Sequence, residues 1–339
     1  MFLKSENRMH KFFYGIIALG FFVSCNNGGS DKGWKGQIIA DHTVVDKFDK
    51  IPAGYMAEVK KMMVYFPGES HSVAYRTGME LLEASDPAFA CNVSTGESYT
   101  DQYVRVNNGG AGEATWYTWY AYDGHNGANK DIIKNSIKEY TDHGHPMHTI
   151  GFGWCWDTTW MNSPSGTVDP VYKMRWAGSS DGGPDGNKIW GLDIDDFAHT
   201  GNRVCMDTYL QATEDYRLYC RDSGYITKVI FTTSPADGYT GENGYQRHIK
   251  HEYLRNFVSE NAERILFDYA DILCYNNDGS RNIVSWTDGD GVVHSYPVIT
   301  AANLGDGSVG HIGSAGAIRL AKAQWWMLAR IAGWDGVTQ

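Results

Sequence analysis

Short apolar runs alternate with longer stretches of helical period along most of this chain. The apolar runs that predict strands lie at residues 62–66, 103–106, 147–152, 228–233 and 265–268. The stretches that carry apolar residues on one helical face lie at 71–82, 131–140, 202–220, 245–261 and 313–332. Strands separated by crossover helices are typical of a parallel sheet. The pattern therefore predicts an α/β fold, a three-layer α/β/α sandwich around a five-stranded parallel sheet.

Two segments interrupt this alternation. Residues 154–200 are rich in glycine and tryptophan, which indicates an insertion after the third strand. Its tryptophans can stack on sugar rings near a site or cover the sheet as core, and we expect core packing for most of them. Residues 283–299 are predicted to form a hairpin, with its turn at Asp288-Gly289-Asp290-Gly291.

The N-terminus has the features of a targeting segment. Lys4, Arg8 and Lys11 precede an apolar run at 12–23, which is too short to span a bilayer and suits a signal peptide. Cys25 follows in a context that resembles the lipobox of bacterial lipoproteins. We expect this cysteine to be acylated; the alternative is an ordinary signal peptide with an incidental cysteine.

This interpretation divides the chain into three parts. Residues 1–24 are a predicted lipoprotein signal peptide, 25–55 a tether and N-terminal extension, and 56–339 the folded domain with its insertion at 154–200. The mature protein is then exported and anchored in the bacterial cell envelope by a lipid on Cys25, on the periplasmic or the cell-surface side. The membrane is a predicted partner through that anchor.

Charge and cysteine content argue against two classes of function. The formal net charge is −11, from 29 basic and 40 acidic residues, and no basic cluster interrupts the acidity. Nucleic-acid binding needs a basic footprint, so no nucleic-acid partner is expected. The cysteines after Cys25 are scattered, without the C-x-x-C spacing of zinc sites. We expect most of these thiols to be buried, and the sequence leaves one or two disulfides open.

Four blocks carry the candidate chemistry, because ligands bind to doubly wound sheets just beyond the carboxyl ends of the strands. The first predicted strand is followed by Gly68-Glu69-Ser70-His71-Ser72. The second is followed by Asn-Asn-Gly-Gly-Ala-Gly-Glu-Ala-Thr at 107–115, and the third by Gly-Phe-Gly-Trp-Cys-Trp-Asp at 151–157. Near the end of the chain, Asp306-Gly307-Ser308-Val309-Gly310-His311 precedes a terminal helix that contains glycine.

These blocks resemble those of the SGNH (GDSL-like) serine hydrolases, a family of esterases, over roughly residues 60–334. That family has Gly-Asp-Ser after the first strand, Asn-x-Gly-x-x-Gly-Asp-Thr after the second, Gly-x-Asn-Asp after the third and Asp-x-x-His before the last helix. This chain departs from the pattern in three places. Glu69 replaces the first aspartate, no asparagine occurs in 151–157, and Ser308 stands three residues before His311. The resemblance implies a flavodoxin-like sandwich of the SGNH hydrolase type.

Carried over residue by residue, the resemblance implies a catalytic set. Ser70 is the nucleophile, and Ser72 in the same turn is the alternative. His311 is the general base and then the general acid, and Asp306 is the candidate that orients it. The amides of Ser70 and Gly112 form the oxyanion hole. No cofactor is implied.

Three functional hypotheses follow. The lead hypothesis is a cell-envelope serine hydrolase that cleaves an ester, such as an acetyl or other small acyl group on a carbohydrate. Its partner is then a glycan or another acylated small molecule. The second hypothesis is a catalytically degenerate, glycan-binding lipoprotein on the same fold, which the missing asparagine and the displaced aspartate favour.

The third hypothesis is a metal-dependent hydrolase that uses His143, His145, His148 and Asp157. The histidines lie where a predicted helix ends and a strand begins, and no acidic partner follows them at ligand spacing. We therefore expect solvated loop histidines and no metal site.

Overall fold

In the computed structural model, the chain divides into two units, Met1–Gly33 and Trp34–Gln339. The structure describes residues 36–94, 98–108, 119–120, 130–154, 205–236, 238 and 240–337, which all belong to the second unit. Of the helices in these ranges, none combines the length and the apolarity that a membrane crossing needs.

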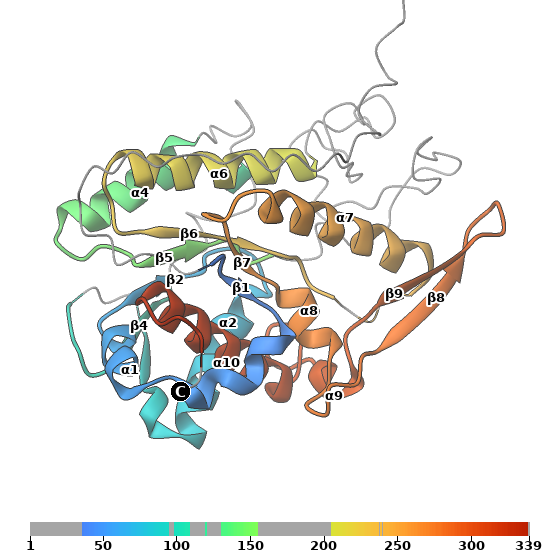
Figure 1. Cartoon of the computed structure of the whole chain (residues 1–339), viewed down its shortest axis with the longest axis horizontal. Coiled ribbons are helices and arrows are strands. Elements are labelled where there is room, and N and C mark those ends of the chain that lie inside the picture. The colour runs from blue at the N-terminus through green and yellow to red at the C-terminus, as the bar shows by residue number, and fades with distance from the viewer. Residues whose placement is uncertain are drawn as a thin grey trace, which may run out of the picture. The chain divides into compact units, whose positions relative to one another are not determined.

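A seven-stranded sheet forms the centre of the second unit (Figure 1). Its strands are β1 (Ile39–Ala40), β2 (Met63–Tyr65), β3 (Cys91–Ser94), β4 (Val104–Asn107), β5 (Thr149–Gly151), β6 (Lys228–Thr232) and β7 (Ile265–Phe267). They lie in the order β1-β7-β6-β5-β2-β4-β3, and every neighbouring pair is parallel. The predicted α/β class with a parallel sheet is confirmed.

The prediction of five strands was wrong, because the sheet has two more strands at its edges. The five predicted strands β2, β4, β5, β6 and β7 follow the flavodoxin-like order, in which the first lies between the second and the third. β1 and β3 are added outside them. β1 has only two residues, and β3 follows the short 3₁₀ turn η2 (Pro87–Phe89) as Cys-Asn-Val-Ser, so neither contains a continuous apolar run.

The folded unit also begins before residue 56. β1 pairs with β7, and the Gln37 side chain donates to the carbonyl of Val258 at 2.8 Å. η1 (His42–Lys50) and α1 (Ala53–Lys60) then pack against α10 (Ser314–Ile331), and Val44 and Val45 of η1 are buried. Part of the segment predicted as a tether and extension is therefore core.

Helices cover both faces of the sheet, as a three-layer sandwich requires. α4 (Asp131–Asp142), α6 (Met206–Asp222) and α7 (Gly241–Ser259) lie on one face, and α1, α2 (Ser72–Ser85), α8 (Tyr269–Cys274) and α10 lie on the other (Figure 1). Strand residues alternate between the two cores: Val64 packs with the α2 and α10 side, whereas Met63 and Tyr65 pack with the α4 and α6 side. This alternation produces the continuous apolar runs that made the strands visible in the sequence.

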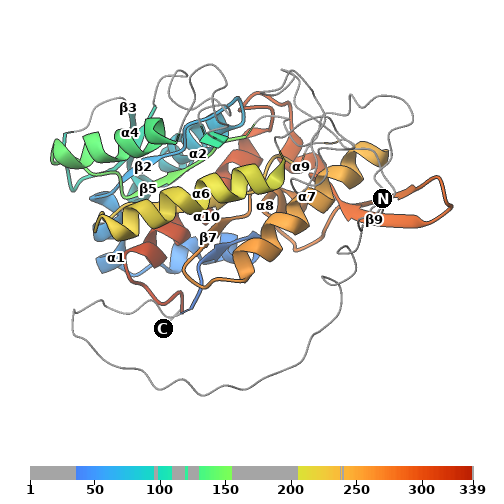
Figure 2. The same cartoon turned by 90° about the horizontal axis from the view of Figure 1, so that it is seen from above.

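The predicted hairpin is confirmed as an antiparallel ribbon of β8 (Ile283–Thr287) and β9 (Val293–Pro297), which extends beyond the helices (Figure 2). Its turn is held by the Asp288 carboxylate, which accepts the amides of Asp290 and Val292 at 2.9 Å each. The His294 ring stacks on Tyr245 of α7 at 4.2 Å between centroids and fixes the ribbon to the helix. α9 (Ala301–Leu304) follows the ribbon.

The cysteines in the described ranges are buried, as the sequence predicts. Cys91, Cys205, Cys220 and Cys274 are free thiols. Burial raises the pKa of Cys205 to about 11, and it raises the pKa values of Cys220 and Cys274 to about 12. These groups are therefore neutral apolar residues of the core.

One close contact between α2 and α10 fixes how these two helices cross. A side chain at Gly78 of α2 would place its Cβ 2.3 Å from the carbonyl oxygen of Ala317 in α10. The Ala317 carbonyl belongs to the helix backbone and cannot move aside. The approach of these two helices therefore requires glycine at this position.

We expect Gly78→Ala to lower the free energy of unfolding by at least about 1–3 kcal/mol, the usual cost of overpacking. Gly54→Ala is the matched control, because Gly54 also lies in a helix and its Cβ would meet open space. Urea denaturation should leave that variant unchanged or raise its stability by up to about 1 kcal/mol. Equal stability of the two variants would contradict the close crossing.

A buried ion pair joins α7 to the end of β7. Nε of Arg255 donates to Oδ2 of Asp268 at 2.6 Å, and Nη2 donates to Oδ1 at 2.8 Å. The Thr233 hydroxyl, beyond β6, also donates to Asp268 Oδ1 at 3.0 Å. Burial acts to raise the pKa of the Asp268 carboxyl, but the Arg255 guanidinium outweighs it, so this pKa lies below its ordinary value.

Because the folded-state pKa of Asp268 is depressed, its contribution to stability is present above the unfolded value of about 3.9 and is lost as pH falls through the folded value. We expect Asp268→Asn to lower the free energy of unfolding at pH 7 by about 3 kcal/mol. It should also flatten the acid limb of a stability-against-pH curve measured by urea denaturation. The exposed Asp222→Asn is the control, and an acid limb unchanged by Asp268→Asn would contradict the assignment.

Candidate active site

The carboxyl ends of β2 and β5 are joined by direct backbone contact. Gly68 and Gly153 form a parallel bridge beyond the strands. The Gly153 amide donates to Pro67 O at 2.7 Å, and the Glu69 amide donates to Gly153 O at 2.7 Å. A Cβ at Gly68, where φ is +141°, would lie 2.0 Å from Gly153 O, so only glycine fits. This contact fixes the loop that carries Ser70 at the switch point of the sheet, where ligands bind in this class of fold.

The two candidate serines have different surroundings in this loop. Ser72 is the first residue of α2 and is 2% exposed. Its hydroxyl accepts from Nη1 of Arg76 at 3.1 Å, and its Cβ would lie 2.4 Å from a Cβ at Gly153. Ser70 is half-buried. The geometry therefore favours Ser70 over Ser72 as a group that a substrate can reach.

A tight turn brings His311 to Ser70. Val309 and Ile312 exchange backbone bonds of 2.8 and 3.2 Å. Between them Gly310 and His311 both have positive φ, at 55° and 69°, which is the pattern of a type I′ turn. A Cβ at Gly310 would lie 2.9 Å from the Ser70 carbonyl oxygen, so this turn packs directly on the Ser70 peptide. Two segments from opposite ends of the domain, each carrying a predicted site residue, thus pack against each other.

His311 is also the one non-glycine residue with positive φ among the residues that the structure describes. A left-handed conformation costs an L-residue roughly 1–2 kcal/mol relative to its usual regions. Glycine would adopt this turn without that cost. A strained residue at the carboxyl edge of the sheet is an observation that points to a functional role for its side chain.

His71 is a second histidine at this site, and the sequence analysis assigned it no role. Its side chain is 1% exposed, and its ring centroid lies 4.9 Å from that of His311. The edge of Tyr269 meets the same ring at 6.2 Å. The only signal in the sequence is its place beside Ser70, because the family pattern has no histidine there.

Asp306 forms hydrogen bonds within its own turn. Its Oδ1 accepts the Ser308 amide at 3.1 Å and the Ser308 hydroxyl at 2.7 Å, and the residue is exposed. The hydrogen bond from the Ser308 hydroxyl lowers the pKa of this carboxyl. An orienting role toward His311 stays a prediction. Gly112 and Cys25 lie outside the described residues.

The resemblance expects an asparagine after the third strand, and none stands in 151–157. Gly153 of this stretch has no room for a side chain, because its Cβ would lie 2.4 Å from the Cβ of Ser72. The adjacent Trp154 is 2% exposed and donates from its indole to Thr232 O at 2.9 Å, so it is core, as we expected for most of the tryptophans. The other tryptophans of the predicted insertion lie outside the described residues.

The histidines of the metal hypothesis lie away from this site. His143 is exposed at the end of α4. His148 precedes β5, at the amino edge of the sheet, and its Nδ1 accepts the Met63 amide at 3.1 Å. Burial, and then the charge of Arg105, lowers the pKa of His148 to about 4. Asp157, the acidic residue of that hypothesis, lies outside the described residues.

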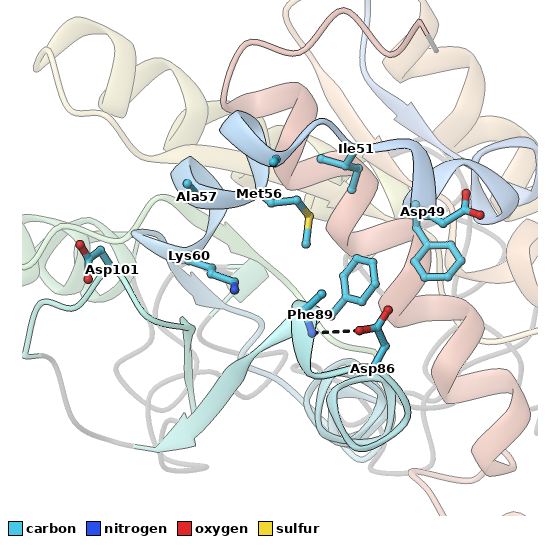
Figure 3. A pocket seen from close by; sticks show the side chains of 11 residues that line it. Asp49, Ile51, Met56, Ala57, Lys60, Asp86, Phe89 and Asp101 are labelled. Carbon is cyan, nitrogen blue, oxygen red and sulfur yellow. Dashed lines mark hydrogen bonds between the residues drawn. The ribbon is translucent and has the colours of Figure 1, made fainter. Parts of the chain in front are cut away.

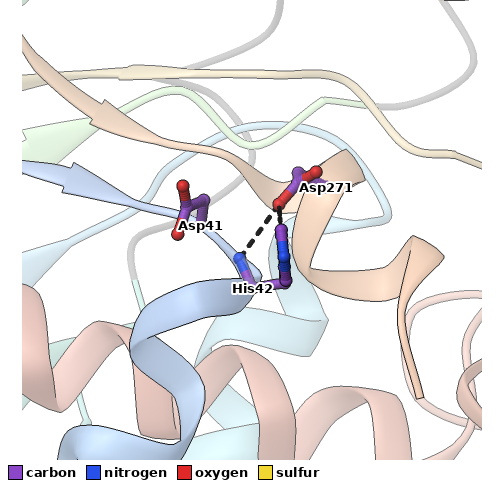
Figure 4. Close-up of side chains that lie close together, drawn as sticks. All are labelled: Asp41, His42 and Asp271. Carbon is purple, nitrogen blue, oxygen red and sulfur yellow. Dashed lines mark hydrogen bonds and ion pairs between the residues drawn. The ribbon is translucent and has the colours of Figure 1, made fainter. Parts of the chain in front are cut away.

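A different group, Asp41, His42 and Asp271, has side-chain atoms within 4.8 Å of one another (Figure 4). Asp271 Oδ2 accepts the His42 amide at 3.0 Å and lies 2.5 Å from His42 Nδ1. Asp41 Oδ1 accepts the Thr43 amide at 2.9 Å and caps η1. These bonds give the cluster a structural role, which is to join η1 to α8.

A pocket of about 550 Å³ opens elsewhere on the domain (Figure 3). Met56 and Phe89 contribute to its apolar wall, and Asp86 and Asp101 are among its carboxylates. Phe89 lies two residues before β3 and Asp101 precedes β4, so the pocket lies at the amino edge of the parallel sheet. Its lining contains none of the predicted site residues.

Comparison with known proteins does not place this chain in a family. No family model matches it, and no curated protein matches it. Among solved structures, it is similar to a protein from Desulfitobacterium hafniense DCB-2 whose assignment as a lipolytic protein of the G-D-S-L family is provisional. The identity is 10%, the match covers 78% of this chain and 99% of that one, and the TM-score is 0.36. A score this low does not establish a relationship, so function has to be argued from the residues themselves.

We expect His311→Gly to leave the free energy of unfolding unchanged or to raise it by up to about 1 kcal/mol, because glycine relieves the positive φ. His294→Gly is the control: His294 lies in β9 and bonds to Asp288 at 2.8 Å, so its loss should destabilise the protein by about 1–2 kcal/mol. Chemical denaturation measures both. If His311→Gly is as unstable as the control, the positive φ of His311 does not cost the protein free energy of unfolding.

Proposed function

We propose that this protein is a serine hydrolase of the SGNH type that cleaves an ester. The observation that carries the proposal is the packing of the Gly310–His311 turn onto the Ser70 peptide. The backbone of the residue before His311 packs on the Ser70 peptide at the carboxyl edge of the sheet, and the His311 imidazole is carried on a residue with positive φ. A nucleophile with an adjacent base is the arrangement that acyl transfer requires.

In the proposed reaction, the Ser70 hydroxyl attacks the ester carbonyl while His311 takes its proton. The tetrahedral intermediate collapses as the carbon–oxygen bond to the alcohol breaks, and His311 returns the proton to the leaving oxygen. Water then attacks the acyl-enzyme, with His311 as base, and releases the acid and free Ser70. The Ser70 and Gly112 amides are the proposed oxyanion donors, and the positive end of the α2 dipole favours the same charge.

The proposed substrate is an acetyl or other small acyl group on a carbohydrate, in the cell envelope. The apolar segment at 12–23 followed by Cys25 supports export and lipid anchoring, and the tryptophan-rich stretch at 154–200 supports contact with sugars. Both supports come from the sequence. The acyl group and the sugar are open questions for the assay.

A second candidate is a glycan-binding protein without catalysis. Two observations favour it. The stretch 151–157 lacks the asparagine that donates to the oxyanion in the family pattern, and the Asp306 carboxylate accepts from Ser308 within its own loop. An enzyme that lacks one oxyanion donor is expected to lose about 10²–10³-fold in kcat. A binding protein would have no measurable hydrolysis.

The test is hydrolysis of short-chain p-nitrophenyl esters and acetylated glycans by residues 33–339, with Ser70→Ala, His311→Ala and Ser72→Ala beside the parent. We expect Ser70→Ala and His311→Ala to lose at least about 10³-fold in kcat/KM. Ser72→Ala should keep parental activity, because its hydroxyl bonds to Arg76.

Each alternative has its own outcome. Activity lost in Ser72→Ala and kept in Ser70→Ala would make Ser72 the nucleophile. A parent without hydrolysis that still binds acetylated glycans would support the binding protein. Hydrolysis that survives both Ser70→Ala and His311→Ala but disappears with a chelator would favour the metal hypothesis.

A further inference from the structure

A ring contact between two histidines adds a residue to the site. His71 and His311 come from segments far apart in the sequence, and their ring centroids lie 4.9 Å apart with planes tilted by 40°. His71 is 1% exposed, whereas His311 is half-buried. The His71 side chain therefore belongs to the core, whereas His311 is partly accessible to solvent.

The backbone of His71 is held from two sides. Its amide donates to Trp154 O at 3.2 Å, beyond β5, and its carbonyl accepts the Ala74 amide at 3.1 Å in the first turn of α2. The edge of Tyr269, at the start of α8, meets the His71 ring at 81° and 6.2 Å. Two segments thus fix the His71 backbone, and Tyr269 packs against its ring.

His311 is held in a different way. The exchange of bonds between Val309 and Ile312 fixes its backbone. Those bonds do not set the rotation of its imidazole about the side-chain torsions, because they involve main-chain atoms only. The His71 ring packs against the His311 imidazole and restrains that rotation.

We infer that His71 is a positioning residue, which holds the His311 ring at the angle that its proton transfer with Ser70 needs. The inference rests on the proposed function. The His71 ring can pack against His311 both before and after His311 takes a proton. A displacement of about 1 Å in a catalytic group can cost on the order of 10²-fold in rate, so a ring support matters for kcat.

The experiment measures kcat and KM of the parent, His71→Ala, His71→Phe and the control Tyr75→Phe on the best ester substrate. Tyr75 packs on Tyr269, at 5.4 Å between ring centroids, and has no place in the proposed reaction. We expect His71→Ala to lower kcat by about 10–100-fold with KM changed less than about threefold. His71→Phe should recover most of the loss because it restores a ring, and Tyr75→Phe should match the parent.

Imidazole NMR of the same variants gives a readout that does not depend on turnover. The resonances of His311 should shift in His71→Ala and stay close to parental in Tyr75→Phe. An active parent whose folded His71→Ala variant keeps parental kcat overturns the inference and leaves the proposed function intact. A loss in His71→Ala that His71→Phe does not recover also overturns it, because it would assign proton transfer to His71. A parent protein without esterase activity overturns both the inference on His71 and the proposed function.

Discussion

The backbone contact between Gly68 and Gly153 is the constraint on which the site depends. It extends the pairing of β2 and β5 past the strands. A Cβ on Gly68 would collide with Gly153, and a Cβ on Gly153 would collide with Ser72. Two glycines without side chains let the loop after β2 close onto the end of β5, where the Glu69 and His71 amides find carbonyl partners. The start of α2 follows from that closure, and so does the surface on which the turn of His311 packs. A larger residue at either position would move the proposed nucleophile and its base apart.

Around this fixed loop, stability and function favour different choices of residue. Glycine would suit position 311 better than histidine does, because the turn requires positive φ there. Asp268, by contrast, stabilises the fold. It binds Arg255 with both carboxylate oxygens and caps the start of α8, whose first residue is Tyr269. A rigid, buried support beneath one strained and half-exposed residue is a common arrangement in catalytic sites.

Strands that are buried on both faces consist of continuous apolar runs, as in Met62 to Phe66, and these runs made the central strands predictable from the sequence. It missed β1, whose two residues are too few to form a pattern, and so placed the start of the domain too late. Ser70 and His311 were found through short motifs. The choice between Ser70 and Ser72 depends on a contact with Arg76, and the role of Gly153 depends on its distance from Ser72. Neither the contact nor the distance can be inferred from the local sequence, because both depend on how the chain packs in three dimensions.

The close packing at Gly153 does not decide between the proposed enzyme and the proposed binding protein. A Cβ at position 153 would collide with Ser72, so the loop of Ser70 can close onto β5 only because this position carries no side chain. In the proposed reaction, stabilisation of the developing oxyanion then falls to backbone amides and to the positive end of α2, which need no side chain. An enzyme that works in the proposed way, with fewer oxyanion donors, would be slow rather than inactive.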